Sequence, residues 1–151
     1  MKTIAHGSQA PDFELPDQDG TPTRLSDQLA HGPVVLFFYP GAMTGGCTKE
    51  ACHFRDLAAE FAEAGARRLG ISADAVAKQK QFADLHGFDY PLLSDEDGAV
   101  ATSFGVRRKH VTPVKRATFV IGRDRTVAAV VSSELNMAVH ADKALVAVRA
   151  L

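Results

Sequence analysis

The feature that most constrains the fold is a run of six apolar residues followed directly by a glycine-rich loop. The run, from Val34 to Tyr39, reads Val-Val-Leu-Phe-Phe-Tyr, so it is β-branched and aromatic and does not alternate with polar residues. This composition predicts a strand whose two faces are both buried. Such a strand is typical of the centre of a mostly parallel sheet.

The segment after this strand predicts a loop and then a helix that begins near Cys47. A proline and three glycines lie between Pro40 and Gly46, which favours a loop. From Cys47 onward, apolar residues recur at three- and four-residue steps, which predicts an amphipathic helix to Ala64, ended by Gly65. Cys47 therefore lies at a helix start beyond the carboxyl end of a central strand, where ligands bind in α/β folds.

This position makes Cys47 a candidate nucleophile. The reactive form of cysteine is the thiolate, and a helix N-terminus favours an anion through its unpaired N–H groups and its partial positive charge. The alternative is a small buried hydrophobic residue, which is the commoner use of an isolated cysteine. The glycine-rich approach and the helix start favour the reactive interpretation.

Cys52 lies five residues further along the same predicted helix. On a regular helix this separation places the two Cα atoms about 8–9 Å apart and turns the side chains about 140° away from each other. A disulfide requires Cα atoms within about 7 Å. A bond between Cys47 and Cys52 would therefore require the first helical turns to unwind, which fits a reversible disulfide better than a static one. The alternative is that Cys52 only packs in the core.

Composition limits the classes of protein and of partner. A length of 151 residues predicts one domain, residues 1–151, and a net charge of −1 gives no reason to expect nucleic-acid or membrane binding. The amino-terminal residues lack the apolar segment of a secretory signal, and no apolar run is long enough to span a membrane. A reducing compartment, most simply a bacterial-type cytoplasm, fits a pair of cysteines that must cycle.

The remaining pattern predicts strands and helices in an α/β order. Expected strands are 13–15 and 23–25 in an N-terminal hairpin, 67–71, 92–93, and 116–121 with 126–131 in a second hairpin. Expected helices are a turn from Ser26 to Ala30 capped by Ser26, one capped by Asp74 and running to His86 before Gly87, 97–104 before Gly105, and one from Val139 with Ala141, Ala144, Leu145 and Val148 on one face. This order predicts a thioredoxin-like α/β fold, with a central mixed sheet flanked by helices and an N-terminal β-hairpin extension.

Around Cys47 the sequence resembles the peroxiredoxins. Their Pro-x-x-x-Thr-x-x-Cys signature is matched by Pro40, Thr44 and Cys47, and a second cysteine five residues on, Cys52, is similar to the Q-type subfamily, also called bacterioferritin comigratory proteins. The similarity continues at 10–15, 90–95 and 116–121. Gly45 departs from the proline that many members have there, and this implies a looser loop.

The resemblance implies a thiol-dependent peroxidase that reduces hydrogen peroxide and organic hydroperoxides. Cys47 would be the peroxidatic cysteine and would become a sulfenic acid, which Cys52 would resolve as a disulfide. Thr44 and Arg116 would donate hydrogen bonds to the reacting atoms, and Pro40 would shield the sulfur. Thioredoxin or a similar dithiol would reduce the disulfide, no cofactor or metal would be needed, and the protein would be a monomer or a weak homodimer.

Other interpretations of the same residues remain open. Thr44 can be a helix cap, Pro40 can simply end the strand, and Arg116 can be an exposed charge at a strand edge. A zinc site built on Cys47, Cys52 and His53 fits poorly with the spacing of structural zinc ligands. The competing functions are a disulfide reductase or redox-regulated binding module on the same fold, and a non-catalytic interaction domain.

Overall fold

The computed structural model describes residues 2–110 and 112–151. Its strands are β1 (Glu14–Pro16), β2 (Pro22–Arg24), β3 (Val34–Phe38), β4 (Arg67–Ser72), β5 (Leu92–Ser94), β6 (Ala117–Ile121) and β7 (Val127–Ser132). Its helices are α1 (Leu25–Leu29), α2 (Gly45–Asp56), α3 (Ala58–Glu63), α4 (Val76–His86), α5 (Ala99–Ser103) and α6 (Ala138–Arg149). Among the described helices, none is both long and apolar enough to cross a membrane.

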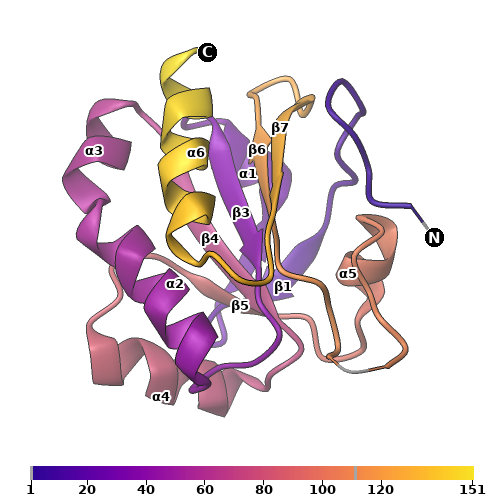
Figure 1. Cartoon of the computed structure of the whole chain (residues 1–151), viewed down its shortest axis with the longest axis vertical. Coiled ribbons are helices and arrows are strands. Elements are labelled where there is room, and N and C mark those ends of the chain that lie inside the picture. Colours follow the sequence, from indigo (N-terminus) through magenta and orange to yellow (C-terminus); the bar gives the residue numbers. More distant parts are fainter. Residues whose placement is uncertain (1, 111) are drawn as a thin grey trace.

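The predicted apolar run forms β3, the middle strand of a five-stranded sheet with the order β5-β4-β3-β6-β7 (Figure 1). β3 pairs with β4 in parallel and with β6 in antiparallel, so the sheet is mixed. β1 and β2 form a separate antiparallel hairpin before it. The thioredoxin-like α/β fold with an N-terminal hairpin is thereby confirmed.

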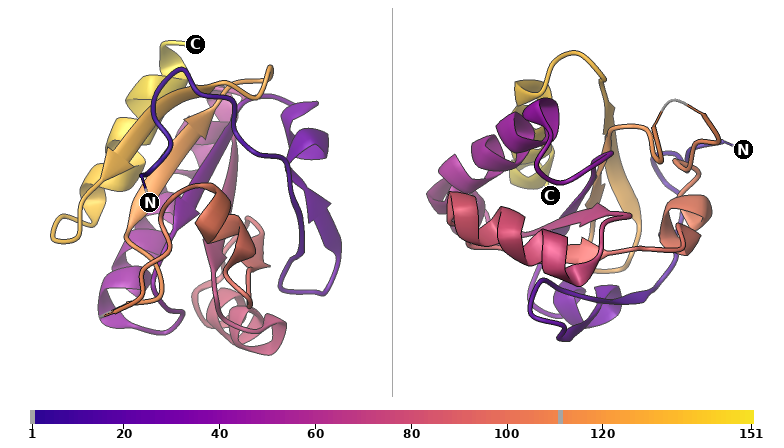
Figure 2. Two further views of the ribbon diagram at one scale, coloured as in Figure 1. Left: turned by 90° about the vertical axis from the view of Figure 1, so that its right-hand side faces the viewer. Right: turned by 90° about the horizontal axis from the view of Figure 1, so that it is seen from below.

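All five residues of β3 are buried because two hydrophobic cores lie on opposite faces of the sheet. Val35 and Phe37 contribute to the core under α2, α4 and α6. Val34, Leu36 and Phe38 contribute to the core under α1 and α5. The views in Figure 2 show helices on both sides of the sheet. Successive residues of a strand point to opposite faces, so a strand between two cores has no polar positions.

The single helix predicted from Cys47 to Ala64 is wrong, because the structure has two helices there. α2 ends at Asp56, and Leu57 leaves helical geometry with φ −95° and ψ 21° before α3 begins. The carbonyl of Phe54, which a continuous helix would bond to the N–H four residues later, accepts a hydrogen bond from Arg68 Nη1 at 2.8 Å. A side chain from β4 therefore competes with the helical hydrogen bond at the break.

Two predicted helix caps are also wrong. Asp74 does not cap α4; its carboxylate accepts the Ala42 N–H at 2.7 Å and the Ser72 hydroxyl at 2.7 Å. Ser26 lies inside α1, where its N–H and hydroxyl both donate to the Asp12 carboxylate, at 3.0 and 2.9 Å. In both cases a carboxylate bonds to a segment distant in sequence, which local cap patterns do not reveal.

Candidate active site

The loop between β3 and α2 carries the candidate site at the carboxyl end of the central strand. Its backbone is held by the segment before α4, because the Ala42 N–H donates to Asp74. Met43 has a φ of 69°, a left-handed conformation that a non-glycine residue rarely adopts. The Thr44 hydroxyl donates to the Gly41 carbonyl at 2.8 Å, which closes the loop just before the helix.

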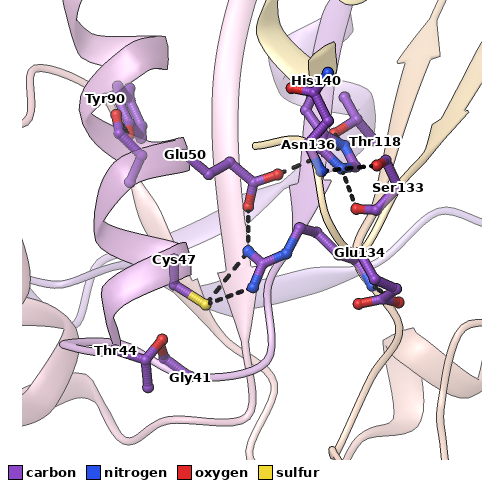
Figure 3. A network of polar contacts seen from close by, with 12 residues as sticks. Gly41, Thr44, Cys47, Glu50, Tyr90, Thr118, Ser133, Glu134, Asn136 and His140 are labelled. Carbon is purple, nitrogen blue, oxygen red and sulfur yellow. Dashed lines mark hydrogen bonds and ion pairs between the residues drawn. The ribbon is translucent and has the colours of Figure 1, made fainter. Parts of the chain in front are cut away.

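Cys47 and Arg116 are in contact next to this loop. Cys47 is the third residue of α2 and is 1% exposed, while Arg116 lies just before β6 and is 7% exposed. Both terminal nitrogens of the guanidinium lie 3.4 Å from Cys47 Sγ (Figure 3). A cation at this distance favours the thiolate over the thiol. Arg116 is thus a buried partner of the sulfur, not an exposed strand-edge charge.

Gly46 makes room for this contact. A Cβ atom on Gly46 would lie 3.3 Å from Arg116 Nη2 and 3.4 Å from the sulfur of Met137. The separation from Arg116 is tighter than an ordinary van der Waals contact, so a side chain at Gly46 would require the guanidinium to shift by a few tenths of an ångström. The first hydrogen bond at this end of α2 runs from the Thr48 N–H to the Thr44 carbonyl at 2.9 Å, so the three preceding N–H groups have no partner within the helix.

Glu50 is a member of the site that sequence reasoning missed. It is fully buried, and its Oε1 accepts a hydrogen bond from Arg116 Nη1 at 2.9 Å. Burial raises the pKa of Glu50 to about 8, although Arg116 acts in the opposite direction. Its position three residues after Cys47, on the same side of a helix, is the signal that sequence analysis overlooked.

Arg116 is held at its backbone as well as at its guanidinium. Its backbone N–H donates to Glu134 Oε1 at 3.0 Å, and Arg108 Nη2 donates to the same oxygen at 2.9 Å. Burial opposes the charged guanidinium, but Glu50 and Cys47 together raise the pKa of Arg116. Arg116 therefore stays charged while its position is fixed by backbone and side chain.

A buried histidine extends the polar contacts away from Cys47. His140 in α6 is fully buried, and its Nδ1 lies 2.8 Å from the Thr118 hydroxyl and 3.5 Å from Glu50 Oε2. Its Nε2 lies 2.8 Å from the Ser133 carbonyl. The apolar pattern of this helix predicted its buried face but gave no indication of a polar residue there.

Cys52 lies on the same helix as Cys47 but outside this cluster. Both cysteines are free thiols. Cys52 is half-buried, and burial raises its pKa. It lines a cavity of about 280 Å³ with Lys49, His53, Asp56 and Ala138. The two sulfurs therefore belong to different environments, and a bond between them requires α2 to change.

The structure brings together only part of the predicted set of site residues. Cys47 and Arg116 are in contact, and Thr44 directly precedes α2. The Thr44 hydroxyl donates to Gly41, so in this state its proton is not directed at the sulfur. Pro40 is half-buried between the end of β3 and the loop, and Cys52 stands apart.

The raised pKa of Glu50 predicts how Glu50→Gln changes stability with pH. The unfolded state loses this proton near the ordinary glutamate pKa of 4.5, whereas the folded state keeps it up to about 8. The contribution of Glu50 to stability is therefore fully present below the unfolded pKa and is lost as pH rises towards 8. Glutamine cannot ionise, so the variant gains stability relative to the parent across this range, by at most about 1.4 kcal/mol per pH unit.

Urea unfolding of both proteins between pH 5 and pH 8, about the interval between the two pKa values, measures this trend. Glu63→Gln, at an exposed position of α3, controls for the loss of one surface carboxylate. A difference between Glu50→Gln and the parent that stays constant with pH would contradict the prediction.

Comparison with known proteins agrees with this geometry. Residues 6–130 match the family model described as the AhpC/TSA family. The crystal structure of peroxidoxin BcpB from Mycobacterium tuberculosis is 62% identical, covers 98% of each chain and superimposes with a TM-score of 0.95. Peroxiredoxin Q from Xanthomonas campestris is 35% identical over 91% of this chain and 90% of its own, with a TM-score of 0.84.

A plant relative extends the similarity. The chloroplastic peroxiredoxin Q of Sedum lineare is 38% identical over 94% of this chain and 76% of its own length. The predicted membership of the Q-type peroxiredoxins is confirmed by these matches. The chain therefore belongs to the AhpC/TSA family, within which it is a Q-type peroxiredoxin, an enzyme that reduces peroxides with a cysteine thiol.

Proposed function

We propose that Cys47 is the peroxidatic cysteine and that Arg116 both holds its thiolate and stabilises the transition state of peroxide reduction. The observation that carries this proposal is the buried contact in which both guanidinium nitrogens lie 3.4 Å from Cys47 Sγ. The thiolate attacks one peroxide oxygen, an S–O bond forms as the O–O bond breaks, and the leaving alkoxide or hydroxide takes a proton from solvent. Cys47 is thereby oxidised to a sulfenic acid while the peroxide is reduced to an alcohol or water.

The negative charge that develops on the leaving oxygen needs hydrogen-bond donors already in place. Arg116 and the free N–H groups at the start of α2 are such donors. We assign the Thr44 hydroxyl to the same role, for which it would turn from the Gly41 carbonyl towards the bound peroxide. Pro40 limits the access of water to the sulfur from the strand side.

We assign Cys52 as the resolving cysteine. Its thiol attacks the Cys47 sulfenic acid, an S–S bond forms, and water leaves. Because both residues lie in α2, this step follows unwinding of the first turns of that helix. A dithiol then reduces the disulfide by thiol–disulfide exchange, and thioredoxin or a similar protein fits this requirement.

The substrates in this proposal are hydrogen peroxide and organic hydroperoxides. A crystallographic study of the Xanthomonas campestris relative names alkyl peroxide reduction as an activity of that protein, which supports the organic class here. We further propose that the enzyme works as a monomer in a bacterial-type cytoplasm, where a reducing environment allows the cysteine pair to cycle.

Cys47→Ser tests the central assignment. A serine hydroxyl is not ionised at neutral pH and cannot form a sulfenic acid, so stoichiometric peroxide consumption by the reduced protein should fall to background. Rapid mixing with hydrogen peroxide, followed by measurement of residual peroxide, gives the result. Consumption by Cys47→Ser at the parent rate would show that another group reacts.

Cys52→Ser separates oxidation from resolution. The first oxidation of Cys47 should proceed at close to the parent rate, because Cys52 does not contact the peroxidatic sulfur. Turnover coupled to thioredoxin should fall at least tenfold, since no intramolecular disulfide can form. Coupled turnover at the parent rate would indicate a cycle with one cysteine and an external thiol. Disulfide substrates reduced faster than hydroperoxides would favour a reductase instead.

A further inference from the structure

A buried polar chain runs from the peroxidatic sulfur to the last helix (Figure 3). Arg116 Nη1 lies 3.4 Å from Cys47 Sγ and 2.9 Å from Glu50 Oε1. The other carboxylate oxygen, Glu50 Oε2, lies 3.5 Å from His140 Nδ1. Glu50 and His140 are fully buried, so water does not dilute the coupling between the groups. The roles proposed above account for Cys47 and Arg116 but leave His140 unused.

We propose that His140 is a positioning residue that acts through Glu50: it accepts the hydrogen bond of the protonated carboxyl group and so keeps Glu50 neutral beside the Cys47 thiolate. This inference rests on the proposed role of Cys47 as a thiolate nucleophile. It assigns His140 to the ionisation of the sulfur and not to contact with the peroxide.

The contacts of His140 fix which ring nitrogen accepts. The Ser133 carbonyl, 2.8 Å from Nε2, can only accept a hydrogen bond, so Nε2 carries the proton. Burial lowers the pKa of His140, which keeps the ring neutral. Nδ1 is therefore an acceptor, and its lone pair faces two groups: the Thr118 hydroxyl at 2.8 Å and Glu50 Oε2 at 3.5 Å.

Glu50 Oε2 is suited to hold a proton. It is buried, and within the described part of the chain it has no hydrogen-bond partner. A carboxylate oxygen in this state is costly, whereas a protonated one can donate to Nδ1. The raised pKa of Glu50 agrees with this arrangement.

The charged and titratable groups around the pair come from every element packed against it. The guanidinium of Arg116, just before β6, contacts both Glu50 and Cys47 on α2. Glu134, after β7, adds negative charge that raises the pKa of Glu50. Tyr90 before β5 bonds to the Ala51 carbonyl beside Glu50. Arg116 is thus the cation that Glu50 and Cys47 share within this group.

The charge count explains why the proton on Glu50 matters. With Cys47 as a thiolate and Glu50 ionised, two negative charges share one buried guanidinium, which leaves a net charge of −1. With Glu50 protonated, the thiolate and Arg116 neutralise each other. A protonated Glu50 therefore leaves the Arg116 cation to the Cys47 thiolate alone, so the buried site carries no net charge when Cys47 ionises.

Two substitutions of His140 separate this role from a purely structural one. The side-chain oxygen introduced by His140→Asn lies near the place of Nδ1 and still accepts from Glu50, whereas His140→Gln places its amide near Nε2 and preserves only the Ser133 contact. All variants carry Cys52→Ser, so Cys47 is the one remaining cysteine. The ultraviolet absorbance of the thiolate, followed from about pH 4 to pH 9, gives the midpoint of Cys47 ionisation.

We expect His140→Gln to raise this midpoint by about one pH unit, which is a tenfold loss of thiolate below the midpoint. His140→Asn should stay close to the parent. In a Glu50→Gln background, His140→Gln should cause no further shift, because the effect passes through Glu50. His86→Gln, on α4 among aromatic rings and away from the chain of contacts, serves as the matched control.

Thr118→Val provides a second, independent variant with the opposite sign. Removing the competing hydroxyl leaves Nδ1 to Glu50 alone, so the midpoint should fall. A midpoint that is unchanged or lowered in His140→Gln, or raised in Thr118→Val, would overturn the inference.

Peroxide consumption by the His140 variants, measured at a pH where Cys47 is fully ionised, should match that of the parent. Loss of that activity in the parent itself would count against the proposed function instead.

Discussion

The contact between the Arg116 guanidinium and the Cys47 sulfur is the interaction on which the rest of the site depends. A buried cation is costly unless it is paired, and Arg116 has two acidic partners, Cys47 and Glu50. β3 and α2 place the sulfur at one side of this contact, and the start of β6, anchored by Glu134, places the guanidinium at the other. Because β3 and β6 are neighbours in the sheet, residues 69 positions apart in sequence meet with little freedom to move.

The same helix has two conflicting tasks. α2 must hold Cys47 against Arg116 for the reaction with peroxide, and it must unwind for Cys52 to reach the sulfur. Gly45 and Gly46 begin the helix, and glycine loses more backbone freedom than alanine when it is fixed in a helix. Ala51 and Phe54 pack the second half into the core, and the Phe37–Phe54 ring pair stacks at 4.2 Å. Unwinding should therefore begin at the glycine end, while the second half stays packed.

Most of the fold was predictable because its signals are local. Composition predicts the unbroken apolar run of β3 and the two hairpins. Glycine predicts the helix ends at Gly65 and Gly87, where the structure has the positive φ that glycine readily adopts. The break at Leu57 was not predictable, because it involves a hydrogen bond from Arg68 on the next strand. The Asp74 and Ser26 caps failed for the same reason: each residue bonds to a distant segment.

The site residues also divide into those with a local sequence signal and those placed by contacts with distant segments. Cys47 could be inferred from its place in the chain, but an arginine at a strand edge is usually exposed, and only the family resemblance connected Arg116 to the sulfur. Glu50 follows Lys49 in what looks like a solvated helix turn, and His140 lies in an alanine- and valine-rich helix. Their burial becomes visible only when α6 packs against α2 and β6.

The most direct test of the account is the rate constant for oxidation of Cys47 by hydrogen peroxide in Arg116→Met, measured by rapid mixing at neutral pH. Methionine keeps much of the side-chain volume but removes the charge and both donors to the sulfur. Arg108→Met, which removes an arginine bound to the same Glu134 but distant from the sulfur contacts, is the matched control. The account predicts a loss of at least about a hundredfold for Arg116→Met, as for removal of a transition-state donor, with little change in the control. A rate within about threefold of the parent, or about 0.65 kcal/mol, would contradict it.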